Sequence, residues 1–219
     1  MMRSADLVRV LFYCTWLHGL LAVHTRSIRS DVIVVDGPTT RGCGVEDKTP
    51  EEAALIESKF FAKQKAKVTS TNGSPRVAGG VIDVYMHIIT DSAGNGALSD
   101  EVIAAQIDVL NAAFAASGFS FREVERDITV NDVWYNMVSG GESSEYAAKR
   151  ALRKGTGADL NFYTAALSDN LLGWATFPYS YDATYAYRDG VVCADFTLPG
   201  AGTGPYSLGD TGTHEVGHW

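Results

Sequence analysis

The last seven residues of the sequence, Thr213-His214-Glu215-Val216-Gly217-His218-Trp219, contain the pattern H-E-x-x-H. On an α-helix, residues four apart lie one turn from each other on the same face, so His214 and His218 can each direct a ring nitrogen to one point. Imidazole nitrogens bind zinc at about 2.0–2.1 Å. The pattern therefore predicts a terminal helix that carries two ligands of one Zn²⁺ ion.

Glu215 follows the first ligand and lies about 100° around the helix from it. That position suits a hydrogen bond to a water beside the metal better than it suits a third ligand. Zinc lowers the pKa of a bound water towards about 7, and a nearby carboxylate can then take its proton. Glu215 is therefore predicted to be a general base, and His214 and His218 metal ligands. The alternative is a solvent-facing helix with two ordinary histidines, although the segment's Thr, Gly and Val residues favour a helix only weakly.

The composition is that of a globular protein with an acidic surface. Of the 219 residues, 46% are hydrophobic and 20% charged, and 26 acidic against 18 basic residues give a net charge of −8. An acidic surface repels phosphate backbones, which argues against a nucleic-acid partner. No stretch of about 18 uninterrupted apolar residues occurs, which argues against a membrane span and stable membrane association.

The first residues resemble a secretory signal. Arg3 and Arg9 are followed by a mostly apolar run from Val10 to Val23. We therefore expect residues 1–24 to be a signal peptide and the protein to be secreted to the extracellular space. The alternatives are a buried N-terminal helix or a wrongly assigned start.

Local patterns predict alternating strands and helices after the N-terminal segment. Thr49 and Glu52 form a capping box around Pro50, which predicts a helix from that point. Ser99 caps a second helix that Gly118 ends. The remaining expected elements are strands at 81–90, 119–124 and 158–167, a helix at 144–154, extended pieces at 173–178 and 188–198, and a terminal helix, with a long connection at 127–141.

Several stretches together resemble one protein family. "LGDTGTHEVGHW", preceded by "DGVV" and "TLPG", closely resembles the pappalysin family of metzincin zinc endopeptidases, especially its secreted, cytophagalysin-like branch. "LSDEVIAAQIDVLNAAFAASGFSF", "ALRKGTGADLNFYTAAL" and "LLGWATFPYSY" also match, in the family's order. The resemblance implies an α+β, metzincin-like zincin upper subdomain, with a twisted, mixed, mostly parallel sheet, backing helices and the active-site helix. It further implies one catalytic Zn²⁺ and a protein or peptide substrate, and it makes the extended stretch Arg188–Leu198 the rim that pairs with substrate.

The family's motif continues as H-E-x-x-H-x-x-G-x-x-H and later turns at a methionine. A third protein ligand of zinc is therefore expected beyond Trp219, together with a lower subdomain that Trp219 would face. On this interpretation residues 79–219 are the N-terminal part of a metzincin catalytic domain, and the chain is an incomplete and inactive form of a secreted zinc metalloendopeptidase. The alternative is a catalytically inactive remnant or binding module of the upper subdomain.

Cys43 lies in "TRGCGVE", before the domain. R-x-C-G resembles the cysteine switch of metzincin propeptides, in which a thiolate occupies the open position of the zinc and keeps the enzyme latent. Residues 25–78 are accordingly interpreted as a propeptide-like segment and linker, with Cys43 as a latency switch; the alternative is a turn with a free or disulfide-bonded cysteine.

Two further residues have plain structural interpretations. Many relatives carry a cysteine where this chain has Ala175, which puts a disulfide of Cys193 in doubt and leaves a buried thiol as the simpler interpretation. His87 is expected to be a sheet histidine, because one histidine on a strand supplies no ligand spacing.

Overall fold

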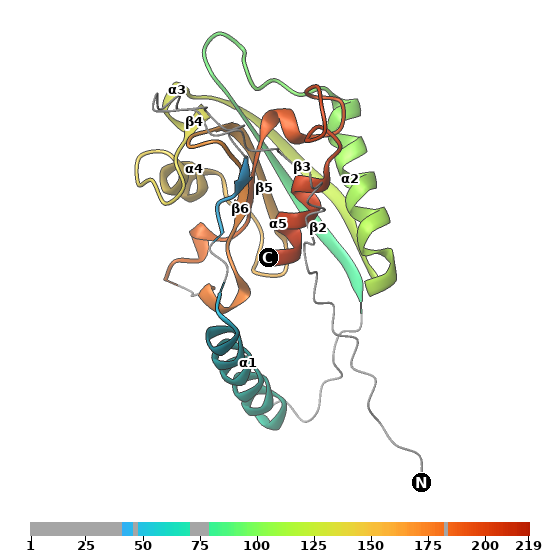
Figure 1. Ribbon diagram of the computed structural model, residues 1–219, viewed down its shortest axis with the longest axis vertical. Helices are drawn as coiled ribbons and strands as arrows, with labels where there is room; N and C mark the ends of the chain where they lie inside the picture. The colour runs from blue at the N-terminus through green and yellow to red at the C-terminus, as the bar shows by residue number, and fades with distance from the viewer. Residues whose placement is uncertain (1–40, 46–47, 71–78, 182–183) are drawn as a thin grey trace, which may run out of the picture. The chain divides into compact units, whose positions relative to one another are not determined.

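A seven-stranded, mostly parallel sheet forms the centre of the fold (Figure 1). Its strands are β1 (Gly42–Cys43), β2 (Gly80–Thr90), β3 (Phe119–Val130), β4 (Asn136–Met137), β5 (Leu160–Leu167), β6 (Leu171–Ala175) and β7 (Val191–Ala194). They follow the order β1-β6-β7-β5-β2-β3, with β4 beside β5. Among the described strands β6 and β7 pair antiparallel, and every other pair is parallel. The sheet is therefore mixed and mostly parallel, as expected.

The computed structural model describes residues 41–45, 48–70, 79–181 and 184–219, and for residues 63–70 it describes the backbone alone. These described residues belong to one compact unit. The predicted signal peptide at 1–24 lies outside the described residues, as does the start of the propeptide-like segment and residues 71–78 of its linker. Those boundaries stay predictions.

In the described part of the chain, the α-helices that accompany the sheet are α1 (Pro50–Ser70), α2 (Asp100–Phe114), α3 (Asp132–Tyr135), α4 (Glu145–Leu152) and α5 (Asp210–His218). The predicted capping box is present, because Thr49 N–H donates to Glu52 at 2.9 Å and Glu52 N–H donates to Thr49 Oγ1 at 3.2 Å. Ser99 accepts from Val102 N–H at the start of α2, and Gly118, with φ of 78°, ends the 3-10 turn after it. Among the described residues, no helix combines the length and the apolar character that crossing a membrane requires.

Side chains of alternate sheet residues enter two different cores. One core faces α2 and α5, and it takes Phe162 of β5 and Cys193 of β7 together with Val216 of α5. The other faces α4, and it takes Tyr163 of β5 and Val192 of β7 together with other buried residues. Figure 1 shows α2 and α4 on opposite sides of the strands. The central strands are thus buried on both faces, which holds the sheet as a rigid support for α5.

Two expected boundaries are wrong. β3 continues to Val130, where it pairs with Thr90, instead of ending near residue 124. The expected long connection at 127–141 is therefore shorter, and it contains α3 and β4. The alternation of polar and apolar residues in "REVERDITV" is typical of an exposed edge strand. Its many polar residues made the second half of this strand difficult to recognise in the sequence.

The expected substrate rim at Arg188–Leu198 is also wrong. β7 lies inside that stretch and is hydrogen-bonded on one side to β5 and on the other to β6. A strand with two neighbours has no free backbone groups for a further strand. The edge of the sheet on this side belongs instead to β6, and β1 pairs with it in parallel.

His87 and Cys193 have the structural roles expected of them. His87 is fully buried in β2, with Nδ1 2.7 Å from Asp127 and Nε2 2.9 Å from Asn161, so both ring nitrogens are engaged far from the terminal helix. Cys193 is fully buried in β7, and it forms no disulfide with Cys43. Burial raises the pKa of the Cys193 thiol well above its usual value, which keeps it protonated and inert.

Candidate metal centre

The terminal helix α5 forms despite a sequence that favours helix only weakly. It follows Gly209, whose φ of 86° suits glycine, and it contains two glycines, two threonines and a valine. Tertiary contacts hold its start: the buried Gln106 of α2 donates to Gly209 O at 3.1 Å. Gly212 allows this approach, because a Cβ there would lie 2.7 Å from Gln106 Nε2. Packing against α2 therefore fixes where α5 begins.

The two histidines of α5 face the same point. Their Nε2 atoms are 3.0 Å apart, and the two rings are perpendicular with centroids 4.6 Å apart. His214 is exposed and His218 is half-buried. The phenyl ring of Phe177 packs edge-on against the ring of His218, with centroids 5.3 Å apart. The spacing in the sequence thus produces the expected pair.

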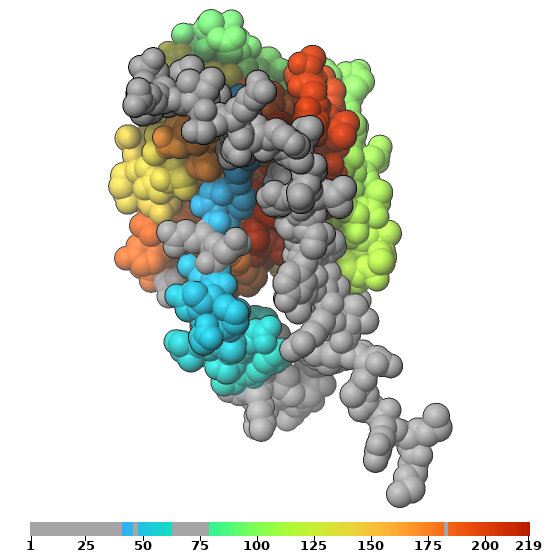
Figure 2. Space-filling view, viewed as in Figure 1, coloured from blue at the N-terminus to red at the C-terminus, as the bar shows by residue number. Residues whose placement is uncertain are grey.

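Cys43 meets these histidines although it lies about 170 residues earlier in the chain, a separation of 175 positions from His218. β1 pairs with β6 so that Cys43 is in register with Gly173, and Gly44 N–H donates to Gly173 O at 2.8 Å. The Cys43 sulfur then lies 3.9 Å from Nε2 of His218. In Figure 2 the segment 41–45, in blue, lies beside the red of α5. Arg41 anchors the same segment, with its guanidinium 4.5 Å from the ring centroid of Phe196.

The donor atoms of Cys43, His214 and His218 lie within 4.8 Å of one another. Tetrahedral zinc with bonds of about 2.0–2.1 Å to nitrogen and about 2.3 Å to sulfur would separate its donors by about 3.3–3.6 Å. The observed separations of 3.0 Å between the two nitrogens and 3.9 Å between sulfur and nitrogen bracket that range. One thiolate with two imidazoles is also a donor set that zinc favours. The residues therefore fit a zinc ion.

Glu215 lies beside this set but points into the protein. It is 1% exposed, its Oε2 accepts from the Cys43 thiol at 3.6 Å, and its Oε1 is buried without a hydrogen-bond partner. Gly173 makes room for the carboxylate. Burial raises the pKa of Glu215 to about 7, and the hydrogen bond from Cys43 opposes this to a smaller extent. An unsatisfied carboxylate of this kind can hold a proton near neutral pH.

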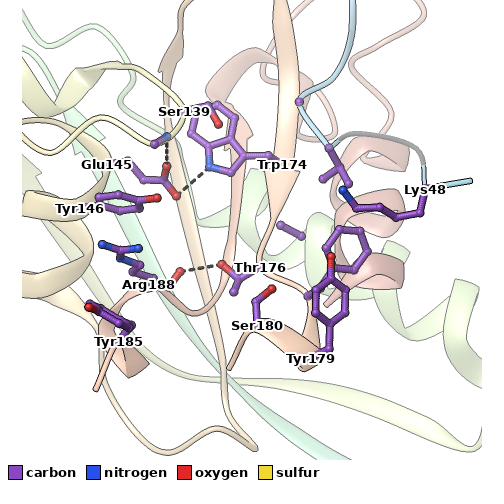
Figure 3. Close-up of a pocket in the computed structure, with 15 residues that line it drawn as sticks. Lys48, Ser139, Glu145, Tyr146, Trp174, Thr176, Tyr179, Ser180, Tyr185 and Arg188 are labelled. Carbon is purple, nitrogen blue, oxygen red and sulfur yellow. Dashed lines mark hydrogen bonds between the residues drawn. The ribbon is translucent and has the colours of Figure 1, made fainter. Parts of the chain in front are cut away.

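A pocket of about 440 Å³ opens where β6 ends (Figure 3). Its wall includes aromatic residues such as Trp174, Phe177 and Tyr179, and Val45 and Lys48 of the N-terminal segment line it too. Beneath it Trp174 donates to Glu145 at 2.9 Å, and Lys149 forms an ion pair with the same carboxylate at 2.8 Å. The segment that carries Cys43 therefore also borders this pocket.

Known proteins with similar sequences are peptidases. An extracellular metalloprotease of Verticillium alfalfae is 42% identical over 84% of this chain and 64% of its own length. One of Uncinocarpus reesii is 32% identical over 91% of this chain and 72% of its own length. The chain belongs to the family of extracellular metalloproteases. It spans less than two thirds of the length of most of the relatives it matches, about 61–64% for the first several.

A solved structure supports the fold of this chain. A mutant promirolysin of Tannerella forsythia matches with a TM-score of 0.60 and 23% identity, over 82% of this chain and 68% of its own. No protein-family model matches the chain. The α+β, metzincin-like fold expected from the sequence is thus confirmed.

In this member of the extracellular metalloprotease family, the structure brings together four residues that the sequence singled out: Cys43, His214, Glu215 and His218. Sequence reasoning missed Gly173, which gives the carboxylate of Glu215 its space. "LLGWATFP" carried a signal for it, because an isolated glycine inside a strand often marks a close approach of another group.

Proposed function

We propose that this protein is a secreted zinc endopeptidase of the pappalysin family, described here in a latent arrangement. The observation that supports this most directly is the meeting of the Cys43 thiol with the two histidines of α5. The names of the relatives, extracellular metalloproteases, support both the hydrolytic activity and secretion.

His214 and His218 would hold the zinc ion, with Cys43 as a third donor. Zinc bound there acts as a Lewis acid towards a peptide carbonyl and lowers the pKa of a water at its open position. The helix keeps the two imidazole nitrogens one turn apart, so the donor pair is organised before the ion arrives.

Glu215 handles the proton in this proposal. It takes a proton from the attacking water on a carboxylate oxygen and later gives it to the amine that leaves. Its burial suits this task, because a carboxylate whose pKa lies near 7 can both accept and release a proton at neutral pH.

Cys43 would keep the enzyme latent in two ways. In the metal-free form its thiol donates to Glu215, which engages the base. When zinc binds, the thiol would lose its proton and the thiolate beside His218 would take the metal position that a water needs. The backbone of β1 also occupies the edge of β6, where an extended peptide substrate would otherwise add as a strand. Cleavage within the N-terminal segment would then remove Cys43 and β1. The edge of β6, the metal position and Glu215 would become available together.

Hydrolysis by a Cys43→Ser variant tests the proposal. The variant, made in a chain that includes the expected third histidine and loaded with one equivalent of zinc, should cleave a quenched-fluorescent peptide mixture without prior processing, whereas the same chain with Cys43 should be at least tenfold slower. Addition of a chelator should stop the cleavage, and the double variant Cys43→Ser/Glu215→Gln should lack it.

Two results would contradict parts of the proposal. Equal rates for parent and Cys43→Ser would remove the latency role of Cys43. Zinc binding without any hydrolysis in Cys43→Ser would contradict the endopeptidase and favour a binding module built on the same subdomain.

A further inference from the structure

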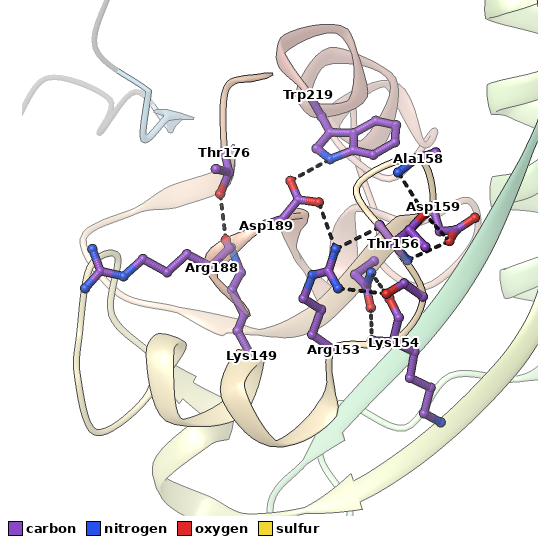
Figure 4. Close-up of polar contacts among 12 residues, drawn as sticks. Lys149, Arg153, Lys154, Thr156, Ala158, Asp159, Thr176, Arg188, Asp189 and Trp219 are labelled. Carbon is purple, nitrogen blue, oxygen red and sulfur yellow. Dashed lines mark hydrogen bonds and ion pairs between the residues drawn. The ribbon is translucent and has the colours of Figure 1, made fainter. Parts of the chain in front are cut away.

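The far end of α5 is tied to the rest of the protein through Trp219. The indole N–H of Trp219 donates to Asp189 Oδ1 at 2.9 Å (Figure 4). Its backbone N–H donates to Glu215 O at 3.1 Å and so closes the last turn of the helix. Trp219 is partly buried and packs against the core between α2 and the sheet. It therefore does not simply face outwards, as its sequence position suggested.

Asp189 is held rigidly from behind. The preceding carbonyl, Arg188 O, accepts from Lys149 Nζ at 2.9 Å and from Thr176 Oγ1 at 2.7 Å. The following residue, Gly190, has φ of 118° and leaves no room for a side chain, because a Cβ would lie 2.4 Å from Asn161 O. Contacts other than the one with Trp219 thus fix the backbone on both sides of Asp189.

Arg153 supplies the countercharge. Its guanidinium lies 3.6 Å from Asp189 Oδ2, and the two side chains are only 11% and 6% exposed. Arg153 is itself oriented by Gly155 O at 3.0 Å and by Thr156 O at 2.8 Å. A buried carboxylate needs such a partner. Burial raises the pKa of Asp189, and the indole N–H of Trp219 and the positive charge of Arg153 oppose that rise.

From this geometry we infer that Asp189 is a positioning residue for the metal centre: its carboxylate, held by Arg153, anchors Trp219 and thereby keeps His218 in register with His214. The inference rests on the proposed zinc site. Asp189 touches neither substrate nor metal ligand, and it acts through Trp219, the residue next to His218.

The physical need for such an anchor follows from the helix itself. Two glycines, two threonines and a valine between Asp210 and His218 give this helix a weak intrinsic preference for its conformation. Gln106 holds its first turn through Gly209 O, and Asp189 holds the residue after His218 through the indole of Trp219. If the last turn of the helix were more mobile, the distance between the ring nitrogens of His218 and His214 would vary more. Residues that orient metal ligands from behind typically contribute 10–100-fold to metal affinity.

A double-mutant cycle on zinc affinity, with the full chain, tests this role. Zinc dissociation constants would be measured by competition with a chromophoric chelator for the parent, Asp189→Ala, Trp219→Phe and the double variant. Each single variant should bind zinc about tenfold more weakly or worse, and the double variant should lose no more than the worse single one, because both remove one hydrogen bond. Asp189→Asn, which keeps an acceptor for the indole, should retain most of the affinity.

A structural role without positioning predicts a different pattern. Asp127→Ala removes a partly buried carboxylate that binds His87 and Lys154 on another part of the sheet, so it should alter stability without altering zinc affinity. Cobalt spectra add a second readout: the visible bands of the Asp189→Ala protein should lose the intensity typical of a tetrahedral site, and those of Asp127→Ala should not.

Three outcomes decide the matter. Additive losses in the cycle, or equal affinities in parent and Asp189→Ala, would overturn the inference while leaving the proposed function intact. No zinc binding by the parent would overturn the proposed zinc site, and the inference with it.

Discussion

Gly173 of β6 faces Glu215 of α5 so closely that no side chain fits between them: a Cβ on Gly173 would lie 2.9 Å from Cγ and 3.1 Å from Oε1 of Glu215. The same Cβ would lie 2.7 Å from Val192 O, so the backbone could not yield easily either. The bare backbone of one strand therefore creates the space in which the carboxylate beside the two histidines is buried.

Gly173→Ala should therefore destabilise the protein and displace Glu215. We expect a loss of about 1–3 kcal/mol in the free energy of unfolding, as for other overpacked interiors. Urea unfolding of parent and variant measures it. Gly42→Ala is the matched control, because Gly42 lies on the neighbouring strand with open space around its Cα. Equal stability of Gly173→Ala and the parent would contradict the described contact.

Two glycines of α5 should respond in opposite directions to the same substitution. Gly212→Ala places a Cβ 2.7 Å from Gln106 and 3.1 Å from Phe162, whereas a Cβ on Gly217 meets nothing within 4 Å. Gly217→Ala should thus stabilise the helix by up to about 1 kcal/mol, and Gly212→Ala should destabilise the protein. Thermal unfolding of the two variants checks the signs, and a shift of both in one direction would contradict the packing of α2 on α5.

Sequence patterns anticipated the elements that have strong local signals. The caps at Thr49 and Ser99 and the spacing of His214 and His218 each act within a few residues, so they can be recognised in the chain itself. The substrate rim could not be placed, because an apolar run such as "VVCA" indicates a strand buried on both faces without saying which strands flank it.

Long-range contacts escaped sequence reasoning for a similar reason. Asp189 and Trp219 are 30 positions apart, and Gln106 and Gly209 are 103 apart. No periodicity links such pairs; the fold alone brings them together. Cys43 was found early because its R-x-C-G motif resembles a known switch, and not because of any spacing to α5.

The buried pair of Glu145 and Lys149 should make stability depend on pH. Burial raises the pKa of Glu145, but the ammonium of Lys149 and the N–H groups of Trp174 and Gly140 together outweigh it and leave the pKa below its usual value. The ionised carboxylate therefore contributes stability above the unfolded-state pKa of about 4.3, and this contribution is lost as the pH falls through the lower folded-state pKa.

Glu145→Gln should accordingly cost about 3–5 kcal/mol at pH 7, since it leaves the fully buried Lys149 without its countercharge. The difference from the parent should shrink below about pH 4, as the parent carboxylate protonates. Urea unfolding at both pH values tests this, with the exposed Glu142→Gln as control. A difference that stays constant with pH would show that the ionised form of Glu145 is not what stabilises the fold.

Glu215→Gln should separate metal binding from hydrolysis. We expect the zinc content of the purified variant, measured by mass spectrometry of the metal, to equal that of the parent, because Glu215 is not among the three donors that lie within 4.8 Å of one another. In the Cys43→Ser background of a chain that includes the expected third histidine, the rate of peptide cleavage should fall by about 10²–10⁴-fold, the usual effect of losing a general base. Stoichiometric loss of zinc would instead make Glu215 a ligand.

X-ray absorption at the zinc edge of the zinc-loaded chain tests the central claim most directly. If Cys43, His214 and His218 form one metal centre, the spectrum should show one sulfur neighbour at about 2.3 Å and imidazole nitrogens at about 2.0–2.1 Å. The sulfur signal should vanish in Cys43→Ser while the imidazole signal persists. A parent spectrum with nitrogen and oxygen neighbours only, or with several sulfur atoms, would contradict the described centre.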